Sequence, residues 1–134
     1  MGKAEAILNV AAAHHRLLWI HPFLDGNGRV ARLVSYSLLL ETLESIPRNF
    51  QYSLGDQLRR AALSVINNIA EGSGKLSKKE KAQFYRISLN SARECIPMLT
   101  ILGKERLISE LEHSNLREDC IHICNMLGNL IASI

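Results

Sequence analysis

Most of the chain after residue 50 repeats apolar positions every three or four residues, the spacing of one face of an α-helix. A first stripe comprises Leu54, Leu58, Ala61 or Ala62, Val65 and Ile69. A second stripe, at the C-terminus, comprises Leu116, Cys120, Ile123, Cys124, Leu127, Leu130, Ile131 and Ile134. No window alternates with the period of two that is typical of strands. The pattern predicts an all-α protein.

Turn and capping residues divide this pattern into separate helices. Helix starts are predicted where a serine precedes a carboxylate by three residues, as in a capping box: Ser53-x-x-Asp56, Ser77-x-x-Glu80 and Ser109-x-x-Glu112. Helix ends are predicted at Pro47, at Gly72 and Gly74, and at Gly103. Pro97 lies inside the pattern over residues 78–102, where we expect one kinked helix rather than two.

The stretch over residues 33–43 is apolar on more than one face. Its apolar members are Leu33, Val34, Tyr36, Leu38, Leu39, Leu40 and Leu43. Such a helix must be buried on several sides, and we expect an N-terminal helix and a neighbouring subunit to cover it. It is shorter than the ~20 apolar residues that span a bilayer, and no signal-peptide pattern precedes it. We therefore expect a cytoplasmic chain with no membrane partner.

The 134 residues suffice for one domain with a real core, and their charge is unevenly distributed. The formal net charge is +3, yet residues 48–93 hold nine basic and three acidic side chains. A basic band of this kind suits contact with the RNA or DNA backbone. A solvated surface or a charge match between subunits would have the same composition. The predicted nucleic-acid contacts are Arg59, Arg60, Lys75, Lys78, Lys79 and Lys81.

Residues 21–32 read HPFLDGNGRVAR, and each part of this run suits a polyphosphate. Gly26 and Gly28 allow consecutive backbone N–H groups to form an anion-binding nest. The helix expected to begin near Gly28 directs its positive end to the same point. Arg29 and Arg32 share one face of that helix and can each bind phosphate oxygens with two N–H groups.

Two further side chains of the run point to catalysis. Asp25 is placed to hold Mg²⁺ against the same phosphates. His21 can titrate near neutral pH and so could take the proton from an attacking hydroxyl. The run as a whole predicts binding of a magnesium–nucleotide complex.

This run resembles the HPFx(D/E)GNGRxxR signature of the Fic family, which transfers AMP from ATP to protein hydroxyls. The resemblance implies that His21 is the general base and Asp25 the Mg²⁺ ligand, with ATP and Mg²⁺ as cofactors. It further implies a phosphate cradle and clamp made of Gly26, Asn27, Gly28, Arg29 and Arg32. Only about the first 45 residues resemble the family, so the sequence leaves enzymatic activity open.

From about residue 50 onward the chain resembles the small four-helix-bundle proteins encoded by intervening sequences in bacterial 23S rRNA genes. The matching segments are QLRRAA at 57–62, NIAEGSG at 68–74, SKKE at 77–80, Phe84-Tyr85, and residues 126–131. In that family one more helix precedes this region, and residues 30–45 occupy its place here. The resemblance implies a homo-oligomer such as a pentameric ring, and its relatives include basic accessory proteins of reverse transcriptases.

We therefore expect an N-terminal helix and a Fic-type loop leading into an antiparallel four-helix bundle. Residues 1–46 would form a Fic-like helix–loop–helix whose second helix is shared with the bundle, and residues 47–134 the rest of the bundle. Two functions stay open. The favoured one is an oligomeric nucleic-acid-binding or protein-interaction bundle that carries a phosphate-binding loop. The alternative is a minimal AMP transferase that uses the bundle as a scaffold.

Overall fold

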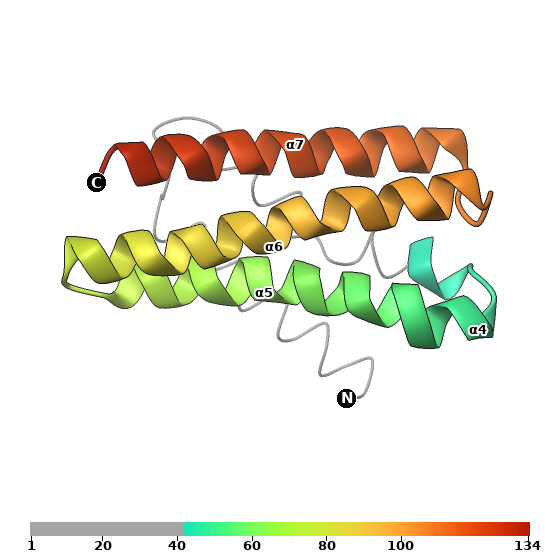
Figure 1. The fold of residues 1–134 in the computed structure, drawn as a ribbon, viewed down its shortest axis with the longest axis horizontal. Helices are drawn as coiled ribbons and strands as arrows, with labels where there is room; N and C mark the ends of the chain where they lie inside the picture. Colours follow the sequence, from blue (N-terminus) through green and yellow to red (C-terminus); the bar gives the residue numbers. More distant parts are fainter. Residues whose placement is uncertain (1–41) are drawn as a thin grey trace.

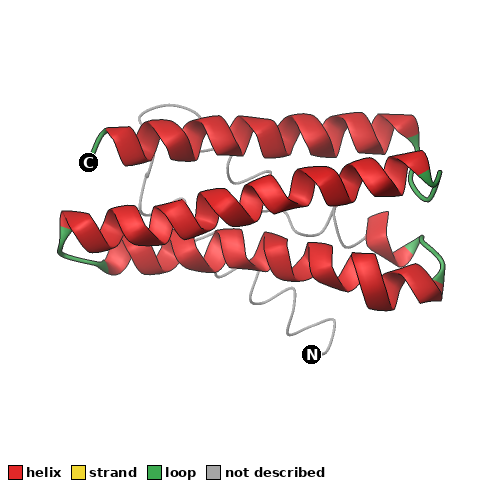
Figure 2. Cartoon of the chain, viewed as in Figure 1, coloured by secondary structure: helices red, strands yellow, loops and turns green. Residues whose placement is uncertain are grey.

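The computed structural model describes residues 42–134, and these residues form an all-α bundle. Three long helices lie side by side: α5 (Asp56–Gly74), α6 (Lys78–Lys104) and α7 (Glu110–Ala132). Helix α6 packs against both α5 and α7, and turns at opposite ends make successive helices antiparallel (Figure 1). Residues 42–134 contain no strand (Figure 2), which confirms the predicted fold class for this part of the chain.

The first helix of this region begins earlier than the capping pattern predicted. Helices α4 (Arg48–Phe50), η1 (Gln51–Gly55) and α5 follow one another without a break. Pro47 occupies the N-cap with φ −57° and ψ 145°, and its missing N–H costs nothing at a helix start. The predicted capping box at Ser53 and Asp56 is therefore wrong. Because the helix already runs through Ser53, its hydroxyl instead donates to the Asn49 carbonyl at 3.1 Å.

A helical turn over residues 42–44 precedes Pro47, so the helix end predicted there is confirmed. Carbonyls at a helix end lack partners within the helix. Here the Gln51 side chain supplies donors, since its Nε2 lies 2.7 Å from the Ile46 carbonyl and 3.2 Å from that of Glu44. This contact ties the end of the preceding turn to the start of the next helix.

The remaining helix boundaries agree with the sequence to within about two residues. Helix α5 ends at Gly74, and α6 runs through Pro97 as a single helix. At the start of α7 the predicted capping box forms. The Glu112 N–H donates to Ser109 Oγ at 3.1 Å, and the Ser109 N–H donates to the Glu112 carboxylate at 2.7 Å. Ser77 also occupies an N-cap, but its side chain makes no capping bond, so that box does not form.

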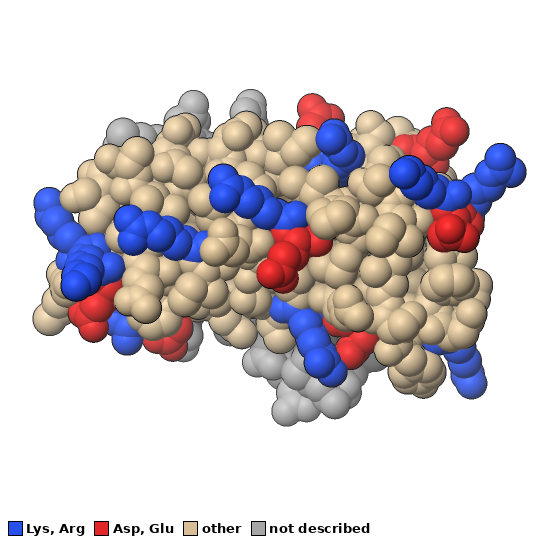
Figure 3. All heavy atoms as spheres, viewed as in Figure 1, with Lys and Arg blue, Asp and Glu red and all other residues tan. Residues whose placement is uncertain are grey.

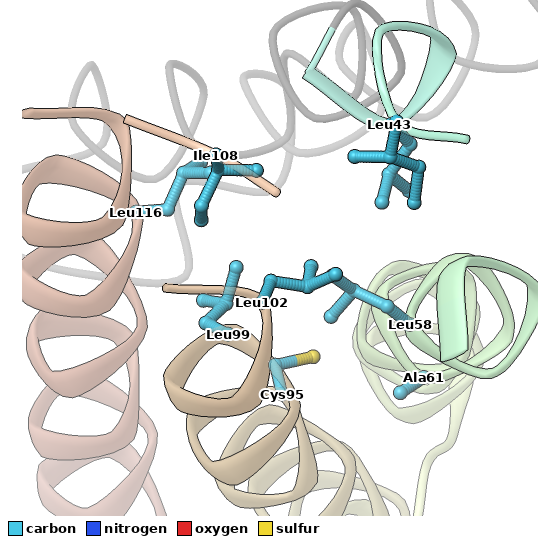
Figure 4. Packing of buried hydrophobic residues seen from close by; sticks show 9 residues of the cluster. Leu43, Leu58, Ala61, Cys95, Leu99, Leu102, Ile108 and Leu116 are labelled. Atoms are coloured by element: carbon cyan, nitrogen blue, oxygen red, sulfur yellow. The ribbon is translucent and has the colours of Figure 1, made fainter. Parts of the chain in front are cut away.

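The apolar stripes bury two clusters along the bundle. The first cluster comprises Val65, Ile66, Ile69, Leu89, Ala92, Ile123, Met126 and Leu127. The second cluster comprises Leu43, Ile46, Leu58, Ala61, Cys95, Leu99, Leu102, Ile108 and Leu116 (Figure 4). Leu43 and Ile46 are 0% and 3% exposed. The residues just before Pro47 therefore belong to the core of the bundle.

Buried hydroxyl groups set the register between α5 and α6. Ser88 is fully buried, and its hydroxyl donates to the Val65 carbonyl at 2.9 Å. The hydroxyls of Ser64 and Ser91 lie 2.8 Å apart. A shift by one residue would leave these buried groups without partners, at about 1–3 kcal/mol each. The two contacts place residue 60 of α5 at about the level of residue 93 of α6.

Candidate functional site

The residues of the predicted phosphate loop lie outside residues 42–134. These are His21, Asp25, Gly26, Asn27, Gly28, Arg29 and Arg32. Most of the apolar stretch over residues 33–43 also lies outside the described part. The roles assigned to these residues stay predictions, and so does the division of the chain at residue 46.

Four of the predicted nucleic-acid contacts lie at the turn between α5 and α6. Lys78 and Lys79 are exposed and open α6, with Lys81 one turn further on. The Lys75 side chain is 35% exposed, and its Nζ lies 5.0 Å from the centre of the Phe84 ring and 3.7 Å from the Glu71 carboxylate. Basic side chains gather at this end of the molecule (Figure 3).

Arg59 and Arg60 lie apart from this turn. They precede Lys75 by about fifteen residues of helix, which corresponds to ~22 Å along α5. Arg60 is bonded to the Asp56 carboxylate one turn earlier, at 2.9 Å. The predicted basic residues therefore do not form one compact patch.

Arg86 and Arg93 are two further basic residues of α6, and the predicted contacts omitted them. Both are exposed on α6, and with Lys79 they recur every seven residues, so the three share one helix face. Arg93 lies at about the level of Arg60 across the α5–α6 pair. We call Lys79, Arg86 and Arg93 the basic stripe. The sequence alone could have identified this stripe, because its three basic residues are spaced seven apart within one predicted amphipathic helix.

A second stripe runs next to the basic one on α6. It alternates acidic and apolar side chains, as Glu80, Ile87, Glu94 and Ile101. The two isoleucines keep 40% and 47% of their surface exposed. An outer face that carries both charge signs and exposed isoleucines could also pair with another helix. A test of nucleic-acid binding must therefore distinguish binding of nucleic acid from pairing of this face with another protein helix.

The outer side of α7 carries a hollow of about 470 Å³. Its lining residues are His113, Ser114, Arg117, Glu118 and Ile121. The His113 ring lies where a side chain on Gly103 would be, 3.0 Å from the position of the missing Cβ. Of the predicted site residues within 42–134, none lines this hollow.

The three cysteines of the chain lie on the facing helices α6 and α7. Cys95 is buried in the second cluster and donates to the Ser91 carbonyl at 3.4 Å, and Cys120 packs against the same cluster. His113, Cys120 and Cys124 all lie on α7, and histidine and cysteine are the usual ligands of a zinc ion. Among residues 42–134, no group of three or more such side chains has the geometry to hold a metal ion.

In the part of the chain that the structure describes, every helix is too short or too polar to cross a membrane.

Known proteins match this chain in two parts, and these parts agree with the two family resemblances found in the sequence. The sequence model of the Fic/DOC family matches residues 1–39. Protein adenylyltransferase Fic from Drosophila grimshawi and that from Drosophila erecta are each 57% identical over 30 residues, and the protein of that name from Nematostella vectensis is 53% identical. These matches cover 22% of this chain but only 6–7% of the relatives' length.

The larger match is to the helical part. The sequence model of the 23S rRNA-intervening sequence protein family matches residues 33–129, which include all three long helices up to the last turns of α7. The match begins inside the Fic/DOC match, so residues 33–39 are common to both. The chain therefore belongs to the 23S rRNA-intervening sequence protein family and carries a Fic/DOC-like segment at its N-terminus.

Proposed function

We propose that this protein binds the phosphate backbone of nucleic acid through α6 and the α5–α6 turn. The observation that carries the proposal is the basic stripe, whose three side chains are exposed and recur along one helix face. From Lys79 to Arg93 the stripe extends for ~21 Å. That length corresponds to about six base pairs of duplex, at 3.4 Å each.

The lysines of the turn extend this surface at one end. Lys78 lies beside Lys79, and Lys75 is held over the Phe84 ring, which keeps its amino group near the turn. Nothing in the described helices resembles a base-reading motif, so the binding should be independent of nucleotide sequence. Self-association, as predicted for the apolar helix over residues 33–43, would repeat the stripe and multiply weak contacts by avidity.

The test is filter binding of a long duplex at low and moderate salt. Two variants reverse the surface, Lys78→Glu/Lys79→Glu and Arg86→Glu/Arg93→Glu. The matched control is Lys104→Glu/Arg117→Glu, which changes the same charge at exposed positions outside the stripe. We expect each stripe variant to bind at least about tenfold more weakly than the wild type. The slope of its binding constant against salt concentration should correspond to about two fewer phosphate contacts.

The control should bind like the wild type, apart from a small effect of net charge. Equal weakening in all three variants would mean that only the overall charge matters, and the proposal would be wrong. Light scattering on the same samples separates the alternative partner. If reversal of the stripe splits an oligomer and leaves nucleic-acid binding unchanged, the stripe is a contact between copies of the chain.

A second candidate function is transfer of AMP to protein hydroxyls. It is favoured by the complete signature from His21 to Arg32 and by the 57% identity to adenylyltransferases over 30 residues. In this function His21 accepts the hydroxyl proton, Asp25 holds Mg²⁺, and Arg29 with Arg32 binds the phosphates. Labelling with α-³²P-ATP and Mg²⁺, comparing wild type with His21→Ala, tests it. Label that depends on His21 supports transfer, and equal or absent label in both proteins excludes it.

A further inference from the structure

Leu76 is an apolar side chain that the fold leaves entirely in solvent. It is the middle residue of the short connection between α5 and α6, and it is 100% exposed. Turns favour glycine, asparagine, aspartate and serine, which suit the backbone or form local hydrogen bonds. Because the leucine is fully exposed, packing within the described bundle does not account for its presence at this position.

Cations surround this leucine. Lys75 precedes it, and Lys78 and Lys79 follow within three residues, both exposed at the start of α6. Leu111 shows the contrast, since it is 71% exposed but lies between two glutamates at the start of α7. The charge around Leu76 therefore favours a polyanionic partner, and the charge around Leu111 does not.

Hydrogen bonds hold the backbone on both sides of this leucine. The Lys75 N–H donates to the Gly72 carbonyl at 3.3 Å, and the Lys81 N–H donates to the Ser77 carbonyl at 3.0 Å. The amino group of Lys75 also lies 5.0 Å from the centre of the Phe84 ring. A side chain on a turn that is already ordered loses little backbone freedom on binding, so more of its burial contributes to affinity.

The position of the turn favours a nucleic acid strand over a membrane surface. The turn lies at one end of the three long helices, whereas the basic stripe continues from there along the side of α6 (Figure 1). A flat anionic surface that meets this end would leave Arg86 and Arg93 ~10 and ~21 Å behind Lys79. A linear polyanion can contact the end and the side of the bundle together.

We propose that Leu76 packs against the faces of unpaired bases, so that the α5–α6 turn selects a bubble, bulge or strand end over a continuous duplex. This inference rests on the proposed binding of nucleic acid and adds to it a preference among nucleic acids. In a continuous duplex the base faces are stacked, and the backbone that the lysines contact is sugar and phosphate, which offers a leucine little apolar surface. Where bases are unpaired, displacing them from the stack costs least, and their faces become available.

The test compares two probes of equal length by fluorescence anisotropy, a fully paired duplex and the same duplex with a central bubble of mismatched bases. The wild type should bind the bubble at least about fivefold more tightly than the paired duplex, as expected from partial burial of one leucine. Leu76→Ser should abolish this preference. Leu111→Ser is the matched control, with the same substitution at an exposed leucine on α7, and it should keep the wild-type preference.

Two further readouts distinguish an apolar contact with bases from an electrostatic one. Because Leu76→Ser changes no charge, its salt dependence should equal that of the wild type. A fluorescent base analogue within the bubble should change its emission when the wild type binds and change less with Leu76→Ser. Circular dichroism of each variant confirms that it is folded.

The outcomes separate this inference from the function on which it rests. If the wild type binds both probes equally, or if Leu76→Ser keeps the preference, the inference is wrong and the proposed function stands. If the wild type binds neither probe, both are wrong. Vesicles of phosphatidylserine and phosphatidylcholine form a third arm. If Leu76→Ser loses retention on the vesicles but keeps the preference for the bubble, the turn contacts a membrane surface and the inference is wrong.

Discussion

Gly72 shows how one missing side chain determines the approach of α5 and α6. It is buried near the end of α5, and a Cβ there would lie 2.7 Å from Tyr85 Cε1 and 3.0 Å from Phe84 Cβ. Tyr85 is only 5% exposed, so its ring has little room to move away. The glycine was predicted from sequence as a helix end. The structure shows that it also permits close packing of the two helices.

We expect Gly72→Ala to lower the free energy of unfolding by about 1–3 kcal/mol, because the added methyl overlaps a fixed ring. Gly128→Ala is the control, since Gly128 lies inside α7 with nothing within 4 Å of its missing Cβ. There the loss of backbone freedom in the unfolded chain should raise stability by about 0.5–1 kcal/mol. Urea unfolding measures both, and equal effects of the two substitutions would contradict this account.

At the scale of helices, local patterns predicted most boundaries but not all of the hydrogen bonds behind them. The sequence predicts a capping box at three helix starts, yet only the one at Ser109 forms both bonds. At Ser53 the helix begins earlier because Pro47 supplies the start. A short sequence pattern shows which capping hydrogen bonds a serine and a carboxylate could form. Whether those bonds form depends on the residue at which the helix begins.

We expect Ser109→Ala to destabilise the protein by about 0.5–2 kcal/mol, since it removes the acceptor of the Glu112 N–H. Ser77→Ala changes the same residue type at the N-cap of α6, where the side chain makes no capping bond. Its effect should stay within about 0.5 kcal/mol. Thermal unfolding of both variants under one condition tests the difference, which would vanish if the capping bonds did not contribute.

The candidate sites show a similar limit of sequence reasoning. The basic stripe could be found from sequence alone, because Lys79, Arg86 and Arg93 lie on one helix and a spacing of seven residues defines their common face. The packing of the His113 ring against Gly103 beside the hollow could not, since it depends on the register of two different helices. Paired hydroxyls such as those of Ser64 and Ser91 fix the register of α5 against α6, and no periodicity along a single helix reveals which hydroxyl meets which.

At the scale of the whole molecule, the residues that lead from the N-terminal segment into the bundle are part of its core. Leu43 is fully buried and packs in the second cluster with Leu58, Leu99 and Leu102 (Figure 4). The match to the bundle family begins at residue 33, before the Fic/DOC match ends at residue 39. Leu43 and Ile46, which follow the Fic/DOC match by a few residues, are therefore part of the packing of the bundle.

Truncation of Leu43 tests how strongly this junction supports the bundle. Leu43→Ala should lower the free energy of unfolding by about 2–5 kcal/mol, because it removes buried methyl groups and leaves a cavity between the end of that helical turn and α5 and α6. Leu76→Ala is the matched control, as Leu76 is fully exposed in the α5–α6 turn, and it should change stability by less than about 0.5 kcal/mol. Denaturant unfolding followed by circular dichroism should show one cooperative transition in both variants, shifted only for Leu43→Ala. A midpoint unchanged by Leu43→Ala would mean that the bundle folds without the segment before Pro47, and the shared helix would have to be abandoned.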